Sequence, residues 1–307
     1  MSKKIIVFGG SGMVGSNLKQ LTSNSKFNFF YPTRDEVDLL NKNKIIQYLD
    51  QFDPSTLIIN LAGKVGGIRA NMNQNYRFLH ENMSINLNLI DAAVKTSKQN
   101  FLNISSSCIY PKNQDKLLKE EDILSAKLEP TNEGYALAKI AALKSCDFIN
   151  KEFKLNYKTI IPCNLYGPFD KFGEDAHMIP AVIKRIHLAK IKGNKEIEMW
   201  GDGNARREFM FVKDLIDFLI YSVKNFEKIP ALMNLGIGRD YTINEYYQTI
   251  INVIGFKGKI NKNLNQPIGM LKKQVDISKQ QKLDWSPSYS LINGVKETYN
   301  YFLKNEI

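Results

Sequence analysis

Two residues near the middle of the chain have the types and the spacing for acid–base chemistry. Tyr135 and Lys139 are four residues apart in a stretch rich in Ala, Leu and Lys, which predicts a helix over residues 135–143. Positions i and i+4 share one face of a helix, so the phenol and the ammonium would lie side by side. A nearby ammonium favours the phenolate and is expected to lower the pKa of Tyr135 from the usual value of about 10. Tyr135 would then give a proton to a carbonyl oxygen while a hydride reaches its carbon. With 14 tyrosines in a Lys-rich chain this spacing also arises by chance, so its meaning depends on the other elements.

A glycine-rich turn near the start of the chain predicts a dinucleotide site. The β-branched run at 5–8 is followed by Gly9, Gly10, Gly12 and Gly15 and then by a helical stretch at 16–21. Glycines let the backbone approach a pyrophosphate, which binds at the helix N-terminus. The spacing fits Gly-x-Gly-x-x-Gly from Gly10 and Gly-x-x-Gly-x-x-Gly from Gly9 and does not choose between these variants.

Arg34 bears on which dinucleotide binds. A second strand is expected at 27–31, and a cofactor-binding unit often carries an acid after it for the ribose 2′-hydroxyl of NAD. Arg34 stands there instead, and its guanidinium suits the 2′-phosphate of NADP. The adjacent Asp35 and the alternative of an exposed loop arginine leave the choice open.

The remaining patterns predict an α/β fold with a Rossmann-type doubly wound parallel sheet. Apolar runs at 56–61, 101–105 and 156–161 alternate with helical segments, as in parallel sheets covered on both faces. Past residue 168 the alternation becomes irregular. We expect a cofactor-binding domain over 1–168, to which 212–235 returns. A smaller α/β substrate-binding domain is expected over 169–211 and 236–307.

The composition and the net charge limit the kinds of partner that the chain is expected to bind. The formal net charge of +11 favours an anion, either nucleic acid or a phosphorylated small molecule, or else reflects solvated lysines. No compact basic run or zinc-finger spacing supports nucleic acid, and no apolar run approaches the length of a membrane span. Three scattered cysteines form neither a disulfide framework nor a metal motif, so we expect no metal and a cytoplasmic location.

Taken together, these motifs resemble the extended short-chain dehydrogenase/reductases. Further runs match the GDP-L-fucose synthase family nearly end to end. They are 64–68, the Ser-Ser-Cys-Ile-Tyr-Pro run at 106–111, Glu-Pro-Thr-Asn-Glu at 129–133, Asn-Leu-Tyr-Gly-Pro at 164–168 and His-Met-Ile-Pro at 177–180. The resemblance implies a homodimer that epimerises a GDP-4-keto-6-deoxy sugar at C3 and C5 and reduces its C4 ketone with NADPH.

The resemblance also implies roles for individual residues. Ser106, Tyr135 and Lys139 would form the reductase triad, and Cys108 and His177 would be the base and the acid of epimerisation. If 101–108 is a strand, Ser106 and Cys108 point to the same side and flank the same sugar. The cofactor positions would be Gly9, Gly10, Ser11, Gly12, Met13, Val14, Gly15, Arg34, Asp38, Leu39, Leu61, Ala62, Tyr135, Lys139, Pro162, Asn164, Leu165 and His177. The substrate positions would be Val65, Gly66, Ser106, Ser107, Cys108, Asn164, Arg185, Trp200, Arg207 and Lys272.

Three departures from the family pattern leave the sugar open. Ser11 replaces an arginine of some members, Gly134 stands where a proline is common, and residues 270–273 differ from a Pro-Arg-Lys run. The main alternative is a GDP-6-deoxy-4-keto-heptose C4 reductase with little or no epimerase activity. A lesser one is an NAD-dependent sugar-nucleotide 4-epimerase or 4,6-dehydratase. A non-catalytic dinucleotide sensor or nucleic-acid-binding protein need not retain the triad together with Cys108 and His177.

Overall fold

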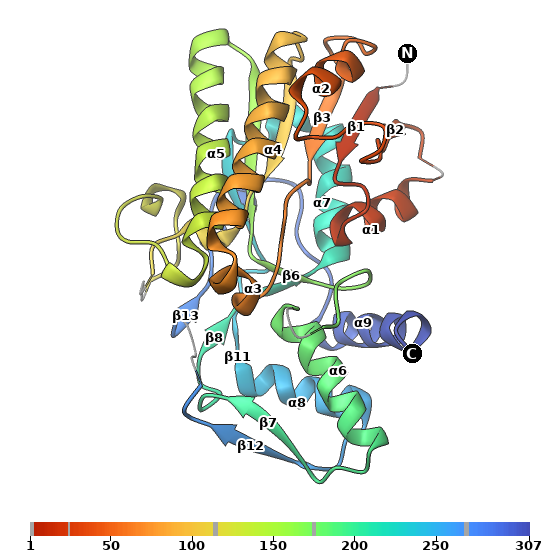
Figure 1. Cartoon of the computed structure of the whole chain (residues 1–307), viewed down its shortest axis with the longest axis vertical. Helices are drawn as coiled ribbons and strands as arrows, with labels where there is room; N and C mark the ends of the chain where they lie inside the picture. Colours follow the sequence, from red (N-terminus) through yellow and green to blue (C-terminus); the bar gives the residue numbers. More distant parts are fainter. Residues whose placement is uncertain (1–2, 24, 113–115, 174–175, 267–269) are drawn as a thin grey trace.

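The computed structural model describes residues 3–23, 25–112, 116–173, 176–266 and 270–307. Figure 1 shows a larger lobe built on a central sheet and a smaller lobe at one end of it. The predicted loop at 169–176 includes residues 174 and 175, which lie outside the described ranges. Within those ranges, no helix is both long enough and apolar enough to cross a membrane.

The central sheet has six strands, all parallel, in the order β10-β5-β4-β3-β1-β2. They are β1 (Lys4–Phe8), β2 (Asn28–Phe30), β3 (Leu57–Asn60), β4 (Asn100–Ile104), β5 (Asn156–Pro162) and β10 (Leu232–Leu235). The order reverses direction after β1, as in a doubly wound sheet, so the predicted fold class is confirmed. Parallel strands place all their carboxyl ends at one edge, where ligands bind in such folds.

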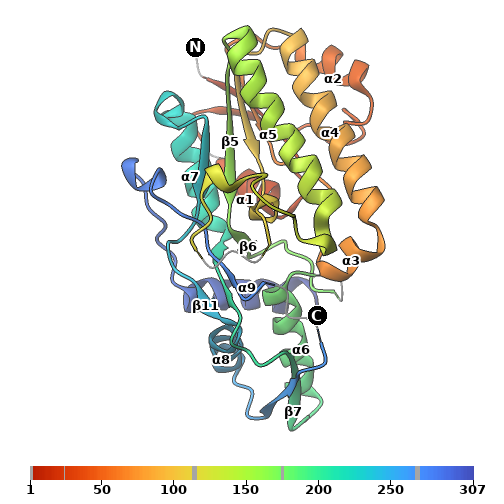
Figure 2. The same cartoon turned by 90° about the vertical axis from the view of Figure 1, so that its left-hand side faces the viewer.

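Helices cover both faces of this sheet because its strands are apolar on both sides. Ile5 and Val7 of β1 face one core cluster, and Ile6 and Phe8 face the other. Figure 2 shows the long helices of one face side by side. The helices of this lobe are α1 (Met13–Thr22), α2 (Lys42–Leu49), α3 (Ile68–Asn73), α4 (Asn75–Lys95), α5 (Glu133–Phe153) and α7 (Val212–Lys224).

In the described residues, the smaller lobe contains three helices, a two-stranded sheet and a three-stranded sheet. Its helices are α6 (Met178–Ile191), α8 (Ile243–Ile254) and α9 (Leu291–Asn305). Its paired strands are β7 (Glu196–Trp200) with β12 (Lys259–Asn263), and β8 (Arg206–Arg207) with β11 (Tyr241–Thr242) and β13 (Lys272–Lys273). Strands β6 (Asn164–Tyr166) and β9 (Phe209–Phe211) pair where the lobes meet.

Short 3₁₀ turns supply several of the connections. They are η1 (Ser107–Ile109), η2 (Glu120–Asp122), η3 (Pro130–Asn132), η4 (Phe226–Lys228) and η5 (Gln280–Lys282). Three of them, η1, η2 and η3, lie between β4 and the helix that carries Tyr135 and Lys139; η1 follows the end of β4, and η3 leads directly into the helix.

Candidate active site

The predicted acid–base pair lies where α5 meets the end of β4. Tyr135 and Lys139 occupy the first two turns of α5. The Nζ of Lys139 donates a 3.0 Å hydrogen bond to the carbonyl oxygen of Ile104, the last residue of β4, and lies 5.9 Å from the centroid of the Tyr135 ring. The side chain of Ser106 is hydrogen-bonded to that of Tyr135. The fold therefore joins a hydroxyl, a phenol and an ammonium from two separate segments.

Burial controls the protonation of this group. Removal from water raises the pKa of Tyr135, the Cys108 thiol acts in the same direction, and the hydrogen bond with Ser106 only partly opposes them. The prediction of a lowered pKa for Tyr135 is therefore wrong for this structure, because burial raises that pKa instead. Burial also lowers the pKa of Lys139 from 10.5 to about 8. The phenol stays protonated at neutral pH, so it is poised to donate a proton to a developing alkoxide.

Asn75 fixes the start of the helix that carries Tyr135, a role that the sequence analysis missed. The amide N–H of Gly134 donates to Oδ1 of Asn75 at 2.6 Å, and Nδ2 of Asn75 donates to the carbonyl oxygen of Pro130 at 3.1 Å. A Cβ on Gly134 would lie 2.4 Å from the backbone oxygen of Asn75. A proline has neither the N–H nor the room, which explains why glycine stands before Tyr135 here.

The predicted strand at 101–108 is right as far as β4 and wrong beyond it. Strand β4 ends at Ile104, and residues 107–109 form the 3₁₀ turn η1. Ser106 caps this turn by accepting a 3.3 Å hydrogen bond from the backbone N–H of Cys108. A serine that bonds its own backbone in this way competes with strand geometry. Ser106 and Cys108 are thus near each other through a turn, not through the alternation of a strand.

Cys108 meets a residue of the small lobe. The Nζ of Lys273, in β13, lies 3.6 Å from Sγ of Cys108, which is half-buried. In the register of β13 with β8, Lys273 is paired with Arg207 and Lys272 with Arg206. Lys272, the predicted substrate residue, lies 3.8 Å from Asp240. The lysine at the thiol is therefore the neighbour of the one that the sequence pointed to.

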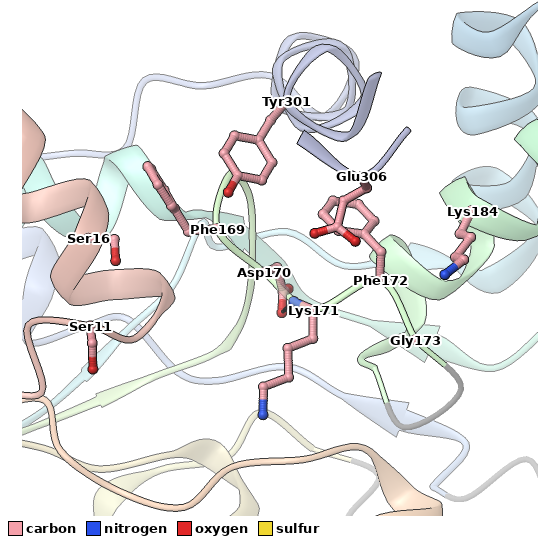
Figure 3. Close-up of a pocket in the computed structure, with 10 residues that line it drawn as sticks. All are labelled: Ser11, Ser16, Phe169, Asp170, Lys171, Phe172, Gly173, Lys184, Tyr301 and Glu306. Carbon is pink, nitrogen blue, oxygen red and sulfur yellow. Dashed lines mark hydrogen bonds between the residues drawn. The ribbon is translucent and has the colours of Figure 1, made fainter. Parts of the chain in front are cut away.

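His177 is the N-cap of α6, a helix of the small lobe. Its Nδ1 lies 3.9 Å from Oδ1 of Asp170, whose side chain is 8% exposed. Asp170 and Lys171 line a pocket of about 410 Å³, and Figure 3 shows them across it from Ser11 and Ser16. This pocket connects the glycine turn with the segment before His177, and its lining does not include Ser106, Cys108 or Tyr135.

The glycine turn has the geometry of a dinucleotide cradle. Gly9 has a φ of +88°, and a Cβ there would lie 2.7 Å from the backbone N of Ala62. A Cβ on Gly15 would lie 2.2 Å from the carbonyl oxygen of Gly9. The N-cap of α1 is Gly12, which offers no side-chain cap, so the first N–H groups of α1 face outward at its positive end. These features fit a pyrophosphate held by the backbone.

The other predicted cofactor residues gather at the same edge of the sheet. They follow β2 or β3, end β5, lie in β6 or cap α6, and are Arg34, Asp38, Leu39, Leu61, Ala62, Pro162, Asn164, Leu165 and His177. Arg34 is exposed in the turn after β2. Its position leaves the guanidinium accessible to the far end of a bound dinucleotide.

The predicted substrate residues of the small lobe lie around β7 and β8. The Nη1 of Arg185 donates to the carbonyl oxygen of Glu198 at 2.9 Å and to the hydroxyl of Tyr247 at 3.3 Å. Trp200 ends β7 and is half-buried. Burial lowers the pKa of Arg207, whose charge is favoured by Glu129 of the motif before Tyr135. Arg207 of the small lobe thus interacts electrostatically with the segment that leads into α5.

Glu208 is a buried carboxylate that the sequence analysis also missed. Its Oε1 accepts hydrogen bonds from the backbone N–H groups of Ile237 and Gly238 at 2.7 and 2.9 Å, and its Oε2 accepts one from Val275 at 2.9 Å. Burial raises the pKa of Glu208 to about 7. Because it follows Arg207 directly, Glu208 ties the strand of that arginine to two later segments of the chain, at 237–238 and at 275. Among the described residues, no three His, Cys, Asp or Glu side chains gather as a metal site would require.

Comparisons with known proteins agree with this geometry. Residues 5–238 match the model of the NAD dependent epimerase/dehydratase family. The chain is 47% identical to GDP-L-colitose synthase of Yersinia pseudotuberculosis, with 99% of each covered. It is 41% identical to GDP-L-fucose synthase of Azorhizobium caulinodans, with 99% of this chain and 98% of that one covered. The solved structure of a GDP-mannoheptose C4 reductase from Campylobacter jejuni with NADP bound superposes with a TM-score of 0.88 at 29% identity, over 98% of both chains.

Proposed function

The chain belongs to the NAD dependent epimerase/dehydratase family, and we propose that it reduces the C4 ketone of a GDP-4-keto-6-deoxy sugar with NADPH and epimerises that sugar at C3 and C5. The observation that carries the proposal is the meeting of Ser106, Tyr135 and Lys139 beside Cys108 at one edge of the sheet. The names of the relatives and the bound NADP of the heptose reductase support the substrate class and the cofactor.

The triad would act on the ketone oxygen. When bound beside it, NADPH would supply the hydride. Ser106 and the protonated Tyr135 donate hydrogen bonds to the oxygen, which polarises the ketone. Tyr135 then gives up its proton, and Lys139 stabilises the phenolate that is left. The same donors stabilise an enolate, because the C4 ketone acidifies the protons at C3 and C5.

Cys108 and His177 would exchange those protons. Cys108 reaches the site from the turn after β4, and Lys273 lies at its sulfur. His177 comes from the start of α6 on the small lobe. A base and an acid held by separate elements suit a reaction that removes a proton from one face of a sugar and returns one on the opposite face.

Recognition of the 2′-phosphate would fall to Arg34. Its exposed guanidinium stands after β2, where a dinucleotide-binding unit contacts the ribose, and a charge-assisted pair with a phosphate is stronger than a neutral hydrogen bond. This position supports NADPH over NADH as the reductant.

The similarity to the heptose reductase supports a second candidate, reduction of a GDP-6-deoxy-4-keto-heptose at C4 without net epimerisation. The test is to incubate the enzyme with NADPH in D₂O and either GDP-4-keto-6-deoxymannose or its heptose analogue, and to read the product by NMR. Deuterium at C3 and C5 with a reduced C4 supports the main proposal. Reduction of the heptose without that deuterium supports the second.

A single substitution tests the proton donor in this assay. Tyr135→Phe should lower C4 reduction by about a hundredfold or more while the Kd for NADPH changes little, because only the proton donor is lost. Normal turnover by this variant would remove Tyr135 from the mechanism.

We also propose that the enzyme works as a homodimer in the cytoplasm. Large apolar side chains are exposed along the adjacent helices α4 and α5, namely Tyr76, Leu87, Leu137, Phe148 and Phe153. An exposed apolar stripe of this kind suits an interface with a second copy. Its three cysteines are free thiols, which suits a reducing compartment. Sedimentation of wild type and Phe148→Glu tests the dimer, which the charge should weaken; a monomeric wild type would contradict it.

A further inference from the structure

The carboxylate of Asp170 is buried but only half satisfied. Its side chain is 8% exposed, and its Oδ1 accepts a hydrogen bond from the backbone N–H of Lys171 at 2.8 Å. Its Oδ2 is buried and has no hydrogen-bond partner among the described residues. Burying a polar atom without a partner costs free energy, and most buried polar groups are therefore paired. A carboxylate placed in this way points to a role beyond packing.

The chain on both sides of Asp170 is held against α9. Phe169 has a φ of +64°, a conformation that a bulky residue adopts only where its surroundings impose it. Its ring packs on Tyr301 with the centroids 4.8 Å apart, and Phe172 packs on Phe302 at 5.0 Å. Phe169, Asp170, Phe172 and Tyr301 line the same pocket (Figure 3). Packing before and after Asp170 therefore fixes the direction of its carboxylate.

The imidazole of His177 lies next to this carboxylate. His177 is the N-cap residue of α6, but its side chain makes no capping hydrogen bond. Its side chain is 43% exposed, and its Nδ1 lies 3.9 Å from Oδ1 of Asp170, which is the distance of an ion pair. Hydrogen bonds of catalytic groups are often long before the substrate binds and tighten in the complex. With Nδ1 turned to a carboxylate, Nε2 is left on the opposite side of the ring, where it can face a ligand.

We propose that Asp170 is a positioning residue that orients His177 as the acid of epimerisation. This inference rests on the proposed function. The protonated imidazole gives its Nε2 proton to C3 or C5 of the enolate, whose electron pair forms the new C–H bond as the C4 ketone is restored. The ring is left neutral, with its remaining proton on Nδ1 facing Asp170. The carboxylate thus keeps the same ring nitrogen directed at the sugar, as an aspartate does for the histidine of serine proteases.

The test is the product ratio of Asp170→Asn, which keeps the shape of the side chain and an acceptor for Lys171 but removes the charge. The variant is incubated with NADPH and GDP-4-keto-6-deoxymannose, and NMR gives the ratio of inverted to non-inverted C4-reduced product. This ratio should fall by about tenfold or more, less than the hundredfold or more typical of losing a general acid, because the imidazole remains. C4 reduction should be largely retained, and the Kd for NADPH and the Tm should not worsen. Glu306→Gln removes another carboxylate from the lining of the same pocket and is the matched control, with an unchanged ratio.

A double variant separates positioning from packing. If Asp170 acts only through His177, adding Asp170→Asn to His177→Gln should lower the ratio no further, whereas independent effects would multiply. A further loss in the double variant, an equal loss of C4 reduction or a weaker Kd for NADPH in Asp170→Asn would contradict the inference. A normal ratio in Asp170→Asn beside a low ratio in His177→Gln would overturn the inference and leave the proposed function standing. A wild-type enzyme that reduces C4 without inversion would overturn the epimerisation and the inference with it.

Discussion

Replacing Lys139 by methionine should slow the enzyme and stabilise it at the same time. Methionine keeps the length and apolar stem of lysine but carries no charge. In the wild type, Nζ lies 5.9 Å from the centroid of the Tyr135 ring. At an effective dielectric constant of about 20, a unit charge at that distance stabilises a phenolate by about 3 kcal/mol. We therefore expect kcat/KM for ketone reduction to fall by about a hundredfold at pH 7.

The pH dependence follows from the lowered pKa of Lys139. Because that pKa is about 8, the ammonium is present below pH 8 and is lost as the pH rises through 8. Tyr135 stays protonated over this range because burial raises its pKa. The wild-type kcat/KM should therefore decline above about pH 8, and the decline should be absent in Lys139→Met.

Lys139→Met should raise the free energy of unfolding although it lowers the activity. Lys139 is 4% exposed, and its pKa is about 8 in the folded chain against 10.5 in the reference state. The folded state therefore binds the proton of the Lys139 ammonium more weakly than the unfolded state does. Below pH 8 the buried lysine is charged, and the whole cost of burying that charge destabilises the fold. The cost disappears as the pH rises from 8 to 10.5, and it amounts to roughly 3 kcal/mol. Losing the hydrogen bond to Ile104 costs about 1 kcal/mol, so the variant should be more stable by roughly 2 kcal/mol at pH 7.

Two assays check this pair of expectations. Initial rates between pH 6 and pH 10, with NADPH saturating, give the activity and its basic limb. Urea unfolding at pH 7 without cofactor gives the free energy of unfolding. A Lys139→Met enzyme with near-normal kcat/KM, or one less stable than the wild type at pH 7, would refute the reasoning from burial and charge.

Three further substitutions have definite expected outcomes. Arg34→Ala should reduce the preference for NADPH over NADH by about tenfold or more, since a charge-assisted pair with phosphate is worth a few kcal/mol; equal use of both cofactors by the wild type would contradict this. Cys108→Ser should stop deuterium exchange at C3 and C5 yet permit C4 reduction, because a hydroxyl is a far weaker acid than a thiol; continued exchange would remove Cys108 as the base. Gly134→Ala should lower stability by about 1–3 kcal/mol in urea unfolding, because its Cβ would lie 2.4 Å from the Asn75 oxygen. Gly173→Ala, with open space around it, is the control, and an equal loss in both variants would count against the clash.

The sequence alone determined the elements and much of the reaction class. Alternating apolar and helical periods predict the strands and the long helices, since each period reports a local backbone conformation. The glycine turn could also be predicted from the sequence. Gly9 and Gly15 are required because the backbone packs too closely around them to leave room for a Cβ. The spacing of Tyr135 and Lys139 gave a common helix face for the same reason.

Only the tertiary structure decided which side chains meet and how they ionise. Cys108 is positioned by a capped turn and meets Lys273, which is distant in the chain. Asn75 at the start of α5 and Arg69 on Trp200 are likewise contacts between separate segments. A sequence pattern carries no information about such partners, because packing selects them. The pKa of Tyr135 is raised and not lowered as predicted, for a related reason. Spacing shows that an ammonium is near, whereas the depth of burial that outweighs it exists only in the assembled fold.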